Sequence, residues 1–286
     1  MTTQQKEQVR EALSSFITGM GSQNKASNKI GVSSAMISQI MNHNWELISD
    51  DMWRKVAAQI GWSSKEWNTV LTRDFKMIQD LLTDAQNNSN VFAVVGSAGS
   101  GKSKAMRAYQ ESHARAYMIS CSEFWNRKDF LSDLLQAMGR DASGLKVREM
   151  MKEIVRLLKS QDRPLLIMDE ADKLSDNVLY FFITIYNELE DQCGMVLCAT
   201  DHLAKRIRRG VSLNKKGYNE IYSRIGRKFI ELNGVGSTDV AQICNANGIT
   251  DSKIIKDIFN DCEFDLRRVK RKIHAVKMIQ NQAQQN

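Results

Sequence analysis

The sequence contains a single proline, Pro164, and only 16 glycines among 286 residues. Because these two residues interrupt helices, their scarcity favours a helix-rich chain with short connections and excludes collagen-like and mucin-like classes. Long apolar runs are also missing: the longest, about nine residues from Val178 to Tyr186, is far shorter than the ~18 needed to cross a bilayer. With 42% hydrophobic and 26% charged residues, we expect a globular chain of about two domains without a membrane span.

Paired cysteines and a secretory signal are missing as well. The N-terminal segment has no charged stretch that leads into an apolar core, which argues against export. The cysteines are odd in number, form no Cys-x-x-Cys pair and have no histidine at zinc spacing, so we expect reduced core thiols in a cytoplasmic protein. They are Cys121, Cys193, Cys198, Cys244 and Cys262.

Positive charge is what the sequence has in excess. There are 40 Lys and Arg against 33 Asp and Glu, a net charge of +7, which favours a polyanionic partner. The excess is local: residues 205–228 hold nine basic residues and one acidic residue, and residues 267–277 hold six basic residues and no acidic one. By contrast, residues 1–80 are almost neutral, with nine basic and eight acidic residues.

Three regions follow one another along the chain. Residues 1–86 show only helical patterns, and the polar run Asn87–Asn90 marks the expected boundary. In residues 87–233 short apolar runs alternate with helical stretches, which predicts an α/β domain with a parallel five-stranded sheet covered on both faces. Residues 234–286 predict a small helical lid with helices over 237–247, 251–260 and 265–282. The expected strands are Val91–Val95, Ala116–Ile119, Leu165–Met168, Met195–Ala199 and Phe229–Leu232.

A phosphate-binding motif follows the first expected strand. The pattern G-x-x-x-x-G-K-[ST] between a strand and a helix is the P-loop, or Walker A motif, of nucleotide-binding proteins. Its backbone amides surround phosphates, its lysine neutralises β/γ charge, and its hydroxyl is offered to Mg²⁺. We therefore expect ATP and Mg²⁺ as cofactors, bound by Gly96, Ser97, Ala98, Gly99, Ser100, Gly101, Lys102 and Ser103.

Two carboxylates end the strand at Leu165–Met168. Asp169 is expected to hold Mg²⁺ together with Ser103, and Glu170 is expected to polarise the attacking water. An apolar run that ends in Asp-Glu is also common where a strand enters a solvated turn. Because this run follows a P-loop at the spacing of a Walker B motif, the catalytic interpretation is favoured.

The order P-loop, apolar strand with Asp-Glu, and strand ending in Thr200 resembles the AAA+ ATPases over residues 91–275. The resemblance implies that Thr200, or else Asp201, senses the γ-phosphate, although many family members have Asn there. It also implies an arginine that reaches the nucleotide of a neighbouring subunit, with Arg224 favoured over Arg227. Phe264-Asp265-Leu266-Arg267 resembles the sensor 2 segment, with Phe in place of Gly, and assigns Arg267 to the nucleotide.

The N-terminal region resembles a helix-turn-helix around Gly31. Ile30, Ile37 and Ile40 would pack two helices together, and the exposed face of the second helix would offer polar side chains to DNA. A small helical domain that binds protein with the same packing is the alternative. The side chains offered to DNA are Ser33, Ser34 and Gln39, with Ser38 and Asn42 beside them.

Basic residues of the ATPase region are further candidates for contact with DNA phosphates. The first group lies after the fourth strand, and the second lies after the second strand, a region that lines the DNA channel in filaments of related proteins. A solvated basic surface is the alternative for either group. The candidates are Lys205, Arg206, Arg208 and Arg209 in the first group and Arg127 and Lys128 in the second.

The order and size of the three regions resemble the phage Mu transposition protein B family across nearly the whole chain. This resemblance implies an ATPase stimulated by double-stranded DNA and by oligomerisation. Such a protein assembles with copies of itself into a ring or helical filament on target DNA, recruits and activates a transposase, and leaves the DNA on ATP hydrolysis. A helicase loader with the same core, or a DNA-binding regulator switched by nucleotide, would have similar motifs.

Overall fold

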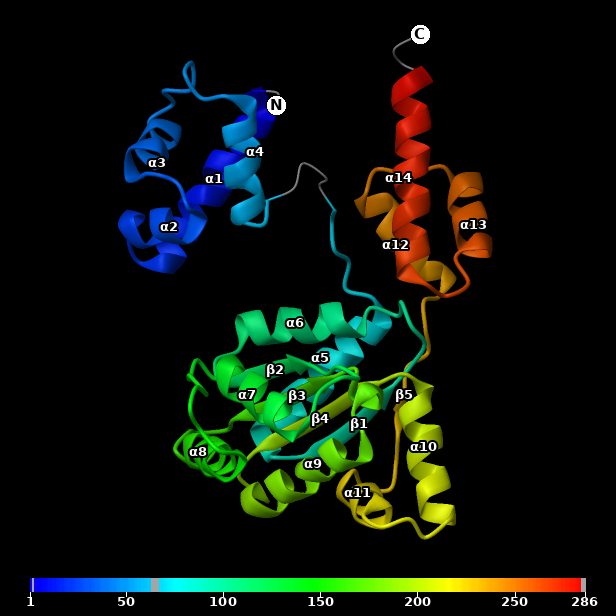
Figure 1. Cartoon of the computed structure of the whole chain (residues 1–286). Helices are drawn as coiled ribbons and strands as arrows, with labels where there is room; N and C mark the ends of the chain where they lie inside the picture. The colour runs from blue at the N-terminus through cyan, green and yellow to red at the C-terminus, as the bar shows by residue number, and fades with distance from the viewer. Residues whose placement is uncertain (2, 63–66, 284–286) are drawn as a thin grey trace. The chain divides into compact units, whose positions relative to one another are not determined.

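The computed structural model describes residues 1, 3–62 and 67–283, and the chain divides into two compact units, Met1–Asn68 and Thr69–Asn286 (Figure 1). The boundary therefore lies before the one expected at residue 86. The reason is α5 (Arg73–Asn88), whose buried Ile78 and Leu82 pack in one core with sheet residues such as Val196. Those 16 residues of helical pattern belong to the α/β unit because their apolar face covers its sheet.

The first unit consists of α1 (Thr3–Met20), α2 (Gln23–Ile30), α3 (Ser34–Met41) and α4 (Asp50–Gln59). Gly31 has φ of 70°, a left-handed conformation that glycine adopts at little cost, and it ends α2 so that α3 can begin three residues later. The expected packing of Ile30, Ile37 and Ile40 is confirmed, because all three are buried in one core with Trp53.

The second unit has a fully parallel sheet in the order β2-β3-β4-β1-β5. The prediction of five parallel strands is thus confirmed, with small differences at the ends. The edge strand β5 pairs only at two positions of β1, Val94 and Val95, and is therefore shorter than expected. The strands are β1 (Val91–Val95), β2 (Ala116–Ser120), β3 (Leu165–Asp169), β4 (Gly194–Ala199) and β5 (Ile230–Glu231).

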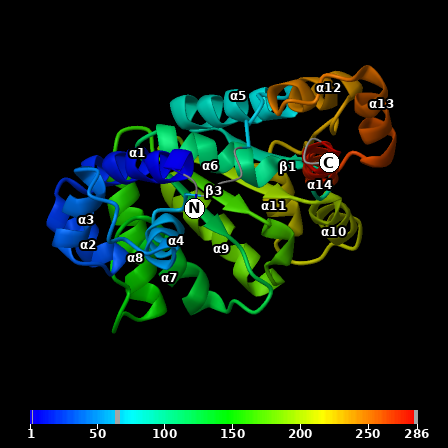
Figure 2. The same ribbon diagram turned by 90° about the horizontal axis from the view of Figure 1, so that it is seen from above.

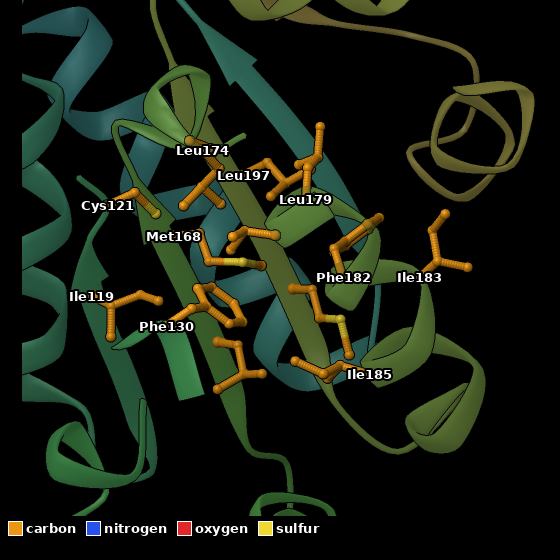
Figure 3. Packing of buried hydrophobic residues seen from close by; sticks show 14 of the residues in the cluster. Ile119, Cys121, Phe130, Met168, Leu174, Leu179, Phe182, Ile183, Ile185 and Leu197 are labelled. Carbon is orange, nitrogen blue, oxygen red and sulfur yellow. The ribbon is translucent and has the colours of Figure 1, made fainter. Parts of the chain in front are cut away.

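Helices cover both faces of this sheet (Figure 2). On one face, α5 and α6 (Lys102–Ser112) pack on strand residues such as Ile167. On the other face, Met168 and Leu197 pack with Phe130 and Phe182 (Figure 3). Because both faces are buried, the strands are continuous apolar runs rather than alternating ones. The second face is covered by α7 (Arg127–Ala137), α8 (Val147–Lys159), α9 (Asp176–Leu189), α10 (Asp201–Ser212) and α11 (Tyr218–Arg224).

Three helices follow β5, as predicted: α12 (Ser237–Ala246), α13 (Ser252–Asp261) and α14 (Leu266–Ala283). Their buried residues include Val240, Ile258 and Val269. All five cysteines are buried and unpaired, as expected for core thiols. Among the described residues, no helix is both long and apolar enough to span a membrane.

Candidate functional site

The loops that follow β1, β3 and β4 meet at one edge of the sheet. These strands are neighbours and parallel, so their carboxyl ends lie together, which is where open α/β sheets bind ligands. Gly96, the first residue after β1, donates its backbone N–H to the carbonyl of Ala199 at the end of β4, at 3.3 Å. The sequence motifs expected for nucleotide binding are therefore brought together by the strand order.

The P-loop, residues 96–103, closes around its own lysine. Gly99 and Gly101 have φ of 80° and 92°, which favours glycine at both positions. Lys102 is only 8% exposed, and its Nζ donates hydrogen bonds to the carbonyls of Gly96 at 2.7 Å and Ser97 at 2.8 Å. A positive charge thus sits inside a loop of backbone groups, as a phosphate-binding site requires.

Asp169 ends β3 and is 2% exposed. Its Oδ1 accepts a hydrogen bond from the backbone N–H of Glu170 at 2.9 Å. Burial raises the pKa of its carboxyl, and the hydrogen bond from Ser103 opposes part of that rise. Within the described residues no three His, Cys, Asp or Glu side chains form a metal cluster. One carboxylate and one hydroxyl nevertheless suit Mg²⁺, which binds few protein groups and completes its shell with phosphates and water.

Glu170 follows Asp169 with φ of 55°, a left-handed conformation that is uncommon for glutamate. Its side chain is 46% exposed, and Oε2 accepts a hydrogen bond from Lys173 Nζ at 2.7 Å. The carboxylate expected to act as a base is thus at the correct edge and paired with a lysine. Sequence reasoning missed Lys173, although a basic residue three positions after an acidic one is a recognisable signal.

Thr200 follows β4 at the same edge, and its hydroxyl donates to Asp172 Oδ2 at 2.5 Å. Asp172 belongs to η1 (Ala171–Lys173), the short helix directly after Glu170. The contact joins the loop after β3 to the residue expected to sense phosphate. Asp172 is not predicted from the sequence, where its only signal is its place three residues after Asp169.

The lid segment expected at the nucleotide is also brought to the P-loop. Leu266 donates its backbone N–H to the carbonyl of Gly99 at 3.0 Å. The carboxylate of Asp265 lies so close to Gly99 that a Cβ added there would be 2.0 Å from Oδ1. Asp265 also accepts from the backbone N–H of Arg267 at 2.7 Å. Arg267 itself is exposed beside this contact.

Arg224 and Arg227 lie at the end of α11 and three residues after it. Arg224 is the last residue of α11, and its guanidinium lies 5.3 Å from the Tyr186 ring and donates to Asn187 Oδ1 at 2.9 Å. Arg227 is exposed and has φ of 56°. In the described part of the chain, neither arginine bonds to residues 96–103.

The three candidates for DNA contact in the N-terminal unit have partners within that unit. Ser33 caps α3, accepting a hydrogen bond from Met36 N at 3.1 Å. Gln23 of α2 donates its side-chain amide to the carbonyl of Ser34 at 2.9 Å. Gln39 is half-buried, and its backbone carbonyl accepts a hydrogen bond from the backbone N–H of Asn44 at 3.0 Å. These groups hold α2, α3 and the following turn together.

The basic cluster in α10 divides into a structural arginine and exposed residues. The guanidinium of Arg206 is bound to Asp176, Tyr218 and two backbone carbonyls of the same chain, and its expected DNA contact stays a prediction. Arg208 lies over Phe229 at 5.1 Å, with an ion pair to Glu231 at 3.6 Å. The remaining candidates are exposed: Lys205 and Arg209 on α10, and Arg127 and Lys128 at the start of α7.

Comparisons with known proteins agree with this geometry. Residues 84–207 match the family described as AAA domain. The chain is 25% identical over 248 residues to Mu-like prophage FluMu DNA transposition protein B of Haemophilus influenzae, which covers 82% of this chain and 83% of that protein.

A solved structure of Drosophila ORC bound to DNA matches with a TM-score of 0.52 and 12% identity. The match covers 77% of this chain and 59% of the ORC chain. Because the sequence identity is so low, the likeness concerns the fold alone. Together with the P-loop motif and the parallel sheet, these matches support an α/β fold of the AAA+ P-loop type, in a chain that is similar to a Mu-like DNA transposition protein B over most of both sequences.

Proposed function

We propose that this protein is a DNA-transposition ATPase that assembles on double-stranded DNA in its ATP-bound form and leaves it after hydrolysis. The observation that carries the proposal is the convergence of Lys102, Asp169 and Glu170 at one sheet edge, with the lid segment on Gly99. Similarity to a DNA transposition protein B over most of both chains gives this ATPase geometry its biological context.

The residues at the edge have complementary roles in phosphoryl transfer. ATP supplies the phosphoryl group, and Mg²⁺ neutralises its developing charge. Gly96, Ser97, Ala98, Gly99, Ser100 and Gly101 would cradle the phosphates, and Lys102 would exchange its present carbonyl partners for phosphate oxygens.

The remaining site residues would handle the metal and the attacking water. Ser103 and Asp169 would hold Mg²⁺. Glu170 would turn from Lys173 to accept a proton from water. Thr200 would sense the γ-phosphate, with its hydroxyl now on Asp172. Arg267 would reach the nucleotide from the lid.

The arginine that completes the site comes from a neighbouring copy of the chain. Arg224 lies at the end of α11 with Tyr186 and Asn187, and in the described residues it has no bond to the P-loop of its own chain. A guanidinium supplied in trans would spread transition-state charge, so hydrolysis would depend on a ring or filament. Arg227 is the second candidate for this role.

Three groups of residues would contact DNA. Lys205, Arg208 and Arg209 of α10 and Arg127 and Lys128 of α7 would meet phosphates, because these side chains are exposed and basic. The N-terminal unit would add hydrogen bonds from Ser33, Ser34 and Gln39. The assembled protein would then recruit and activate a transposase.

Electron microscopy of the full-length protein with DNA of arbitrary sequence tests this proposal. We expect filaments or rings on DNA with ATP, and none with ADP or without nucleotide. Glu170→Gln should keep the assemblies in ATP, because binding survives and hydrolysis stops. Sequence-specific dimers that form without nucleotide would instead support a regulator, and stable complexes with a replicative helicase would support a loader.

Point variants of the two arginines test the assembly step. Arg224→Ala should bind ATP normally and lose DNA-stimulated hydrolysis by about 1,000-fold, the usual contribution of such an arginine. Arg227→Ala is the matched variant three residues away. If only Arg227→Ala loses hydrolysis, the role moves to Arg227, and if neither does, hydrolysis needs no arginine in trans.

A further inference from the structure

Arg206 is a half-buried arginine at the centre of a polar network that has no assigned role in the proposed ATP hydrolysis. Its Nη1 donates to the carbonyls of Leu174 at 2.6 Å and Asp172 at 3.3 Å, directly after the Glu170 turn. Its Nε donates to Tyr218 Oη at 3.0 Å, at the start of α11. One side chain of α10 therefore bonds both to the loop after β3 and to α11.

Asp176, the first residue of α9, completes the network. Its Oδ1 accepts from Arg206 Nη2 at 2.5 Å and from Tyr218 Oη at 2.6 Å, and Lys215 pairs with Oδ2. Burial alone would raise the pKa of this carboxyl, but the hydrogen bonds from Lys215, Tyr218 and Arg206 outweigh it and hold the pKa far below its ordinary value. The carboxylate therefore stays charged, and the network stays intact at neutral pH.

Tyr218 is held too tightly to move independently of these partners. It is 1% exposed, and its ring lies so close to α10 that a Cβ on Gly210 would be 2.3 Å from Tyr218 Cγ. The other end of α11, seven residues long, is Arg224. Because a helix is stiff over two turns, the place of Tyr218 sets the place of Arg224.

We infer that Arg206 and Tyr218 are positioning residues that link the nucleotide site of one subunit to the arginine it presents to the next. The path runs from Thr200 to Asp172, from the Asp172 carbonyl to Arg206, and from Arg206 through Tyr218 to α11. Binding or loss of the γ-phosphate that breaks the hydrogen bond from Thr200 to Asp172 would thus change the position of Arg224 relative to the nucleotide site of the neighbouring subunit. This inference rests on the proposed role of Arg224 in trans.

Mixing experiments with full-length protein and DNA separate an effect on the neighbour from an effect on the subunit's own site. Tyr218→Phe keeps the ring and removes the hydroxyl that bonds Arg206 and Asp176. We expect normal ATP binding and about tenfold lower DNA-stimulated hydrolysis, the effect of losing a hydrogen bond to charged groups. Tyr117→Phe is the matched control, since it loses one hydroxyl bond, to Gln161, at the far edge strand.

Glu170→Gln subunits, which cannot hydrolyse ATP but present a native α11, are then added to each variant. They should restore hydrolysis to Arg224→Ala and equally to Tyr218→Phe, whose own sites are intact. Failure to restore Tyr218→Phe while Arg224→Ala is restored, or hydrolysis by Tyr218→Phe equal to that of Tyr117→Phe, would overturn the inference and leave the proposed function standing.

Failure to restore Arg224→Ala would overturn the role in trans itself, and the inference with it. If Tyr218→Phe does not fold, Arg206→Lys gives the same test. It keeps the charge and loses the fork that bridges Leu174 and Tyr218.

Discussion

The nucleotide edge of the sheet and the α2–α3 pair both present polar side chains, but they use them in opposite ways. At the edge, Lys102 and Asp169 are buried, and Glu170 adopts a left-handed backbone. In the helix pair, Ser33 satisfies a helix terminus, and Gln23 ties α2 to α3. Polar groups held in unfavourable environments indicate a site for chemistry, whereas polar groups that cap and tie helices contribute to stability.

The largest expected effect tests the edge directly. Lys102→Ala should lower ATP affinity by about 100-fold, because the ammonium that meets the phosphates is lost. Lys104→Ala, an exposed residue of the same helix, is the control and should bind ATP normally. Titration with a fluorescent ATP analogue measures both. Equal affinities for the two variants would mean that the loop around Lys102 does not bind phosphate.

Two glycines with similar backbones sharpen the comparison. Gly31 and Gly99 have φ of 70° and 80°, and each would be strained by about 1 kcal/mol on substitution with alanine. Nothing lies within 4 Å of a Cβ on Gly31, whereas a Cβ on Gly99 meets Asp265. Gly31→Ala should therefore only lower the free energy of unfolding, while Gly99→Ala should also weaken ATP binding about tenfold by displacing the lid segment.

Urea unfolding and ATP titration of both variants check this difference. Unchanged ATP affinity in Gly99→Ala would show that the contact between Asp265 and the P-loop is not needed for binding.

The contrast also explains which predictions from sequence were correct. The strand that ends in Asp169, and the strand and helix on either side of residues 96–101, could be predicted because each depends on a local pattern, an apolar run followed by a fixed motif. The expected boundary at residue 86 was wrong because α5 has the same helical period as the helices before it. Only the packing of Ile78 and Leu82 on the sheet reveals that it belongs to the second unit.

Other contacts could not be predicted from the sequence, because they pair polar groups that lie far apart along the chain. Arg206 belongs to a basic run in sequence, but its partner Asp176 is 30 residues away. The bonds from Thr200 to Asp172 and from Leu266 to Gly99 likewise join segments far apart in sequence. A charge count cannot distinguish an arginine that binds its own chain from one that is free to bind DNA.

In the α2–α3 pair, substitutions at Ser33 can separate its role as a helix cap from its proposed contact with DNA. Ser33→Ala should lower the free energy of unfolding of the N-terminal unit by about 1 kcal/mol, since the bond to Met36 is lost. Ser33→Asp keeps a capping oxygen and should retain that stability, while its negative charge should weaken DNA binding if the residue faces a phosphate. Thermal unfolding and DNA titration measure the two effects. Full DNA affinity in Ser33→Asp would leave Ser33 as a cap only.

The smallest expected effect is a gain in stability at the nucleotide edge. Burial raises the pKa of Asp169 in the folded state above its ordinary value of 3.8, so folding favours the protonated form. Wild-type protein therefore loses stability as the pH rises from the unfolded-state pKa through the folded-state pKa. Asp169→Asn has no charge to bury and should unfold at a higher urea concentration than wild type at pH 7, with the difference vanishing near pH 3.

The same variant should bind Mg²⁺-ATP less tightly than wild type, because the carboxylate that holds the metal is gone. Nucleotide titration with and without Mg²⁺ measures this loss beside the urea curves. If Asp169→Asn instead unfolds more easily at pH 7, the hydrogen bond from Ser103 outweighs burial. The aspartate would then stabilise the fold much as Ser33 does, and the contrast between the two regions would fail at its central residue.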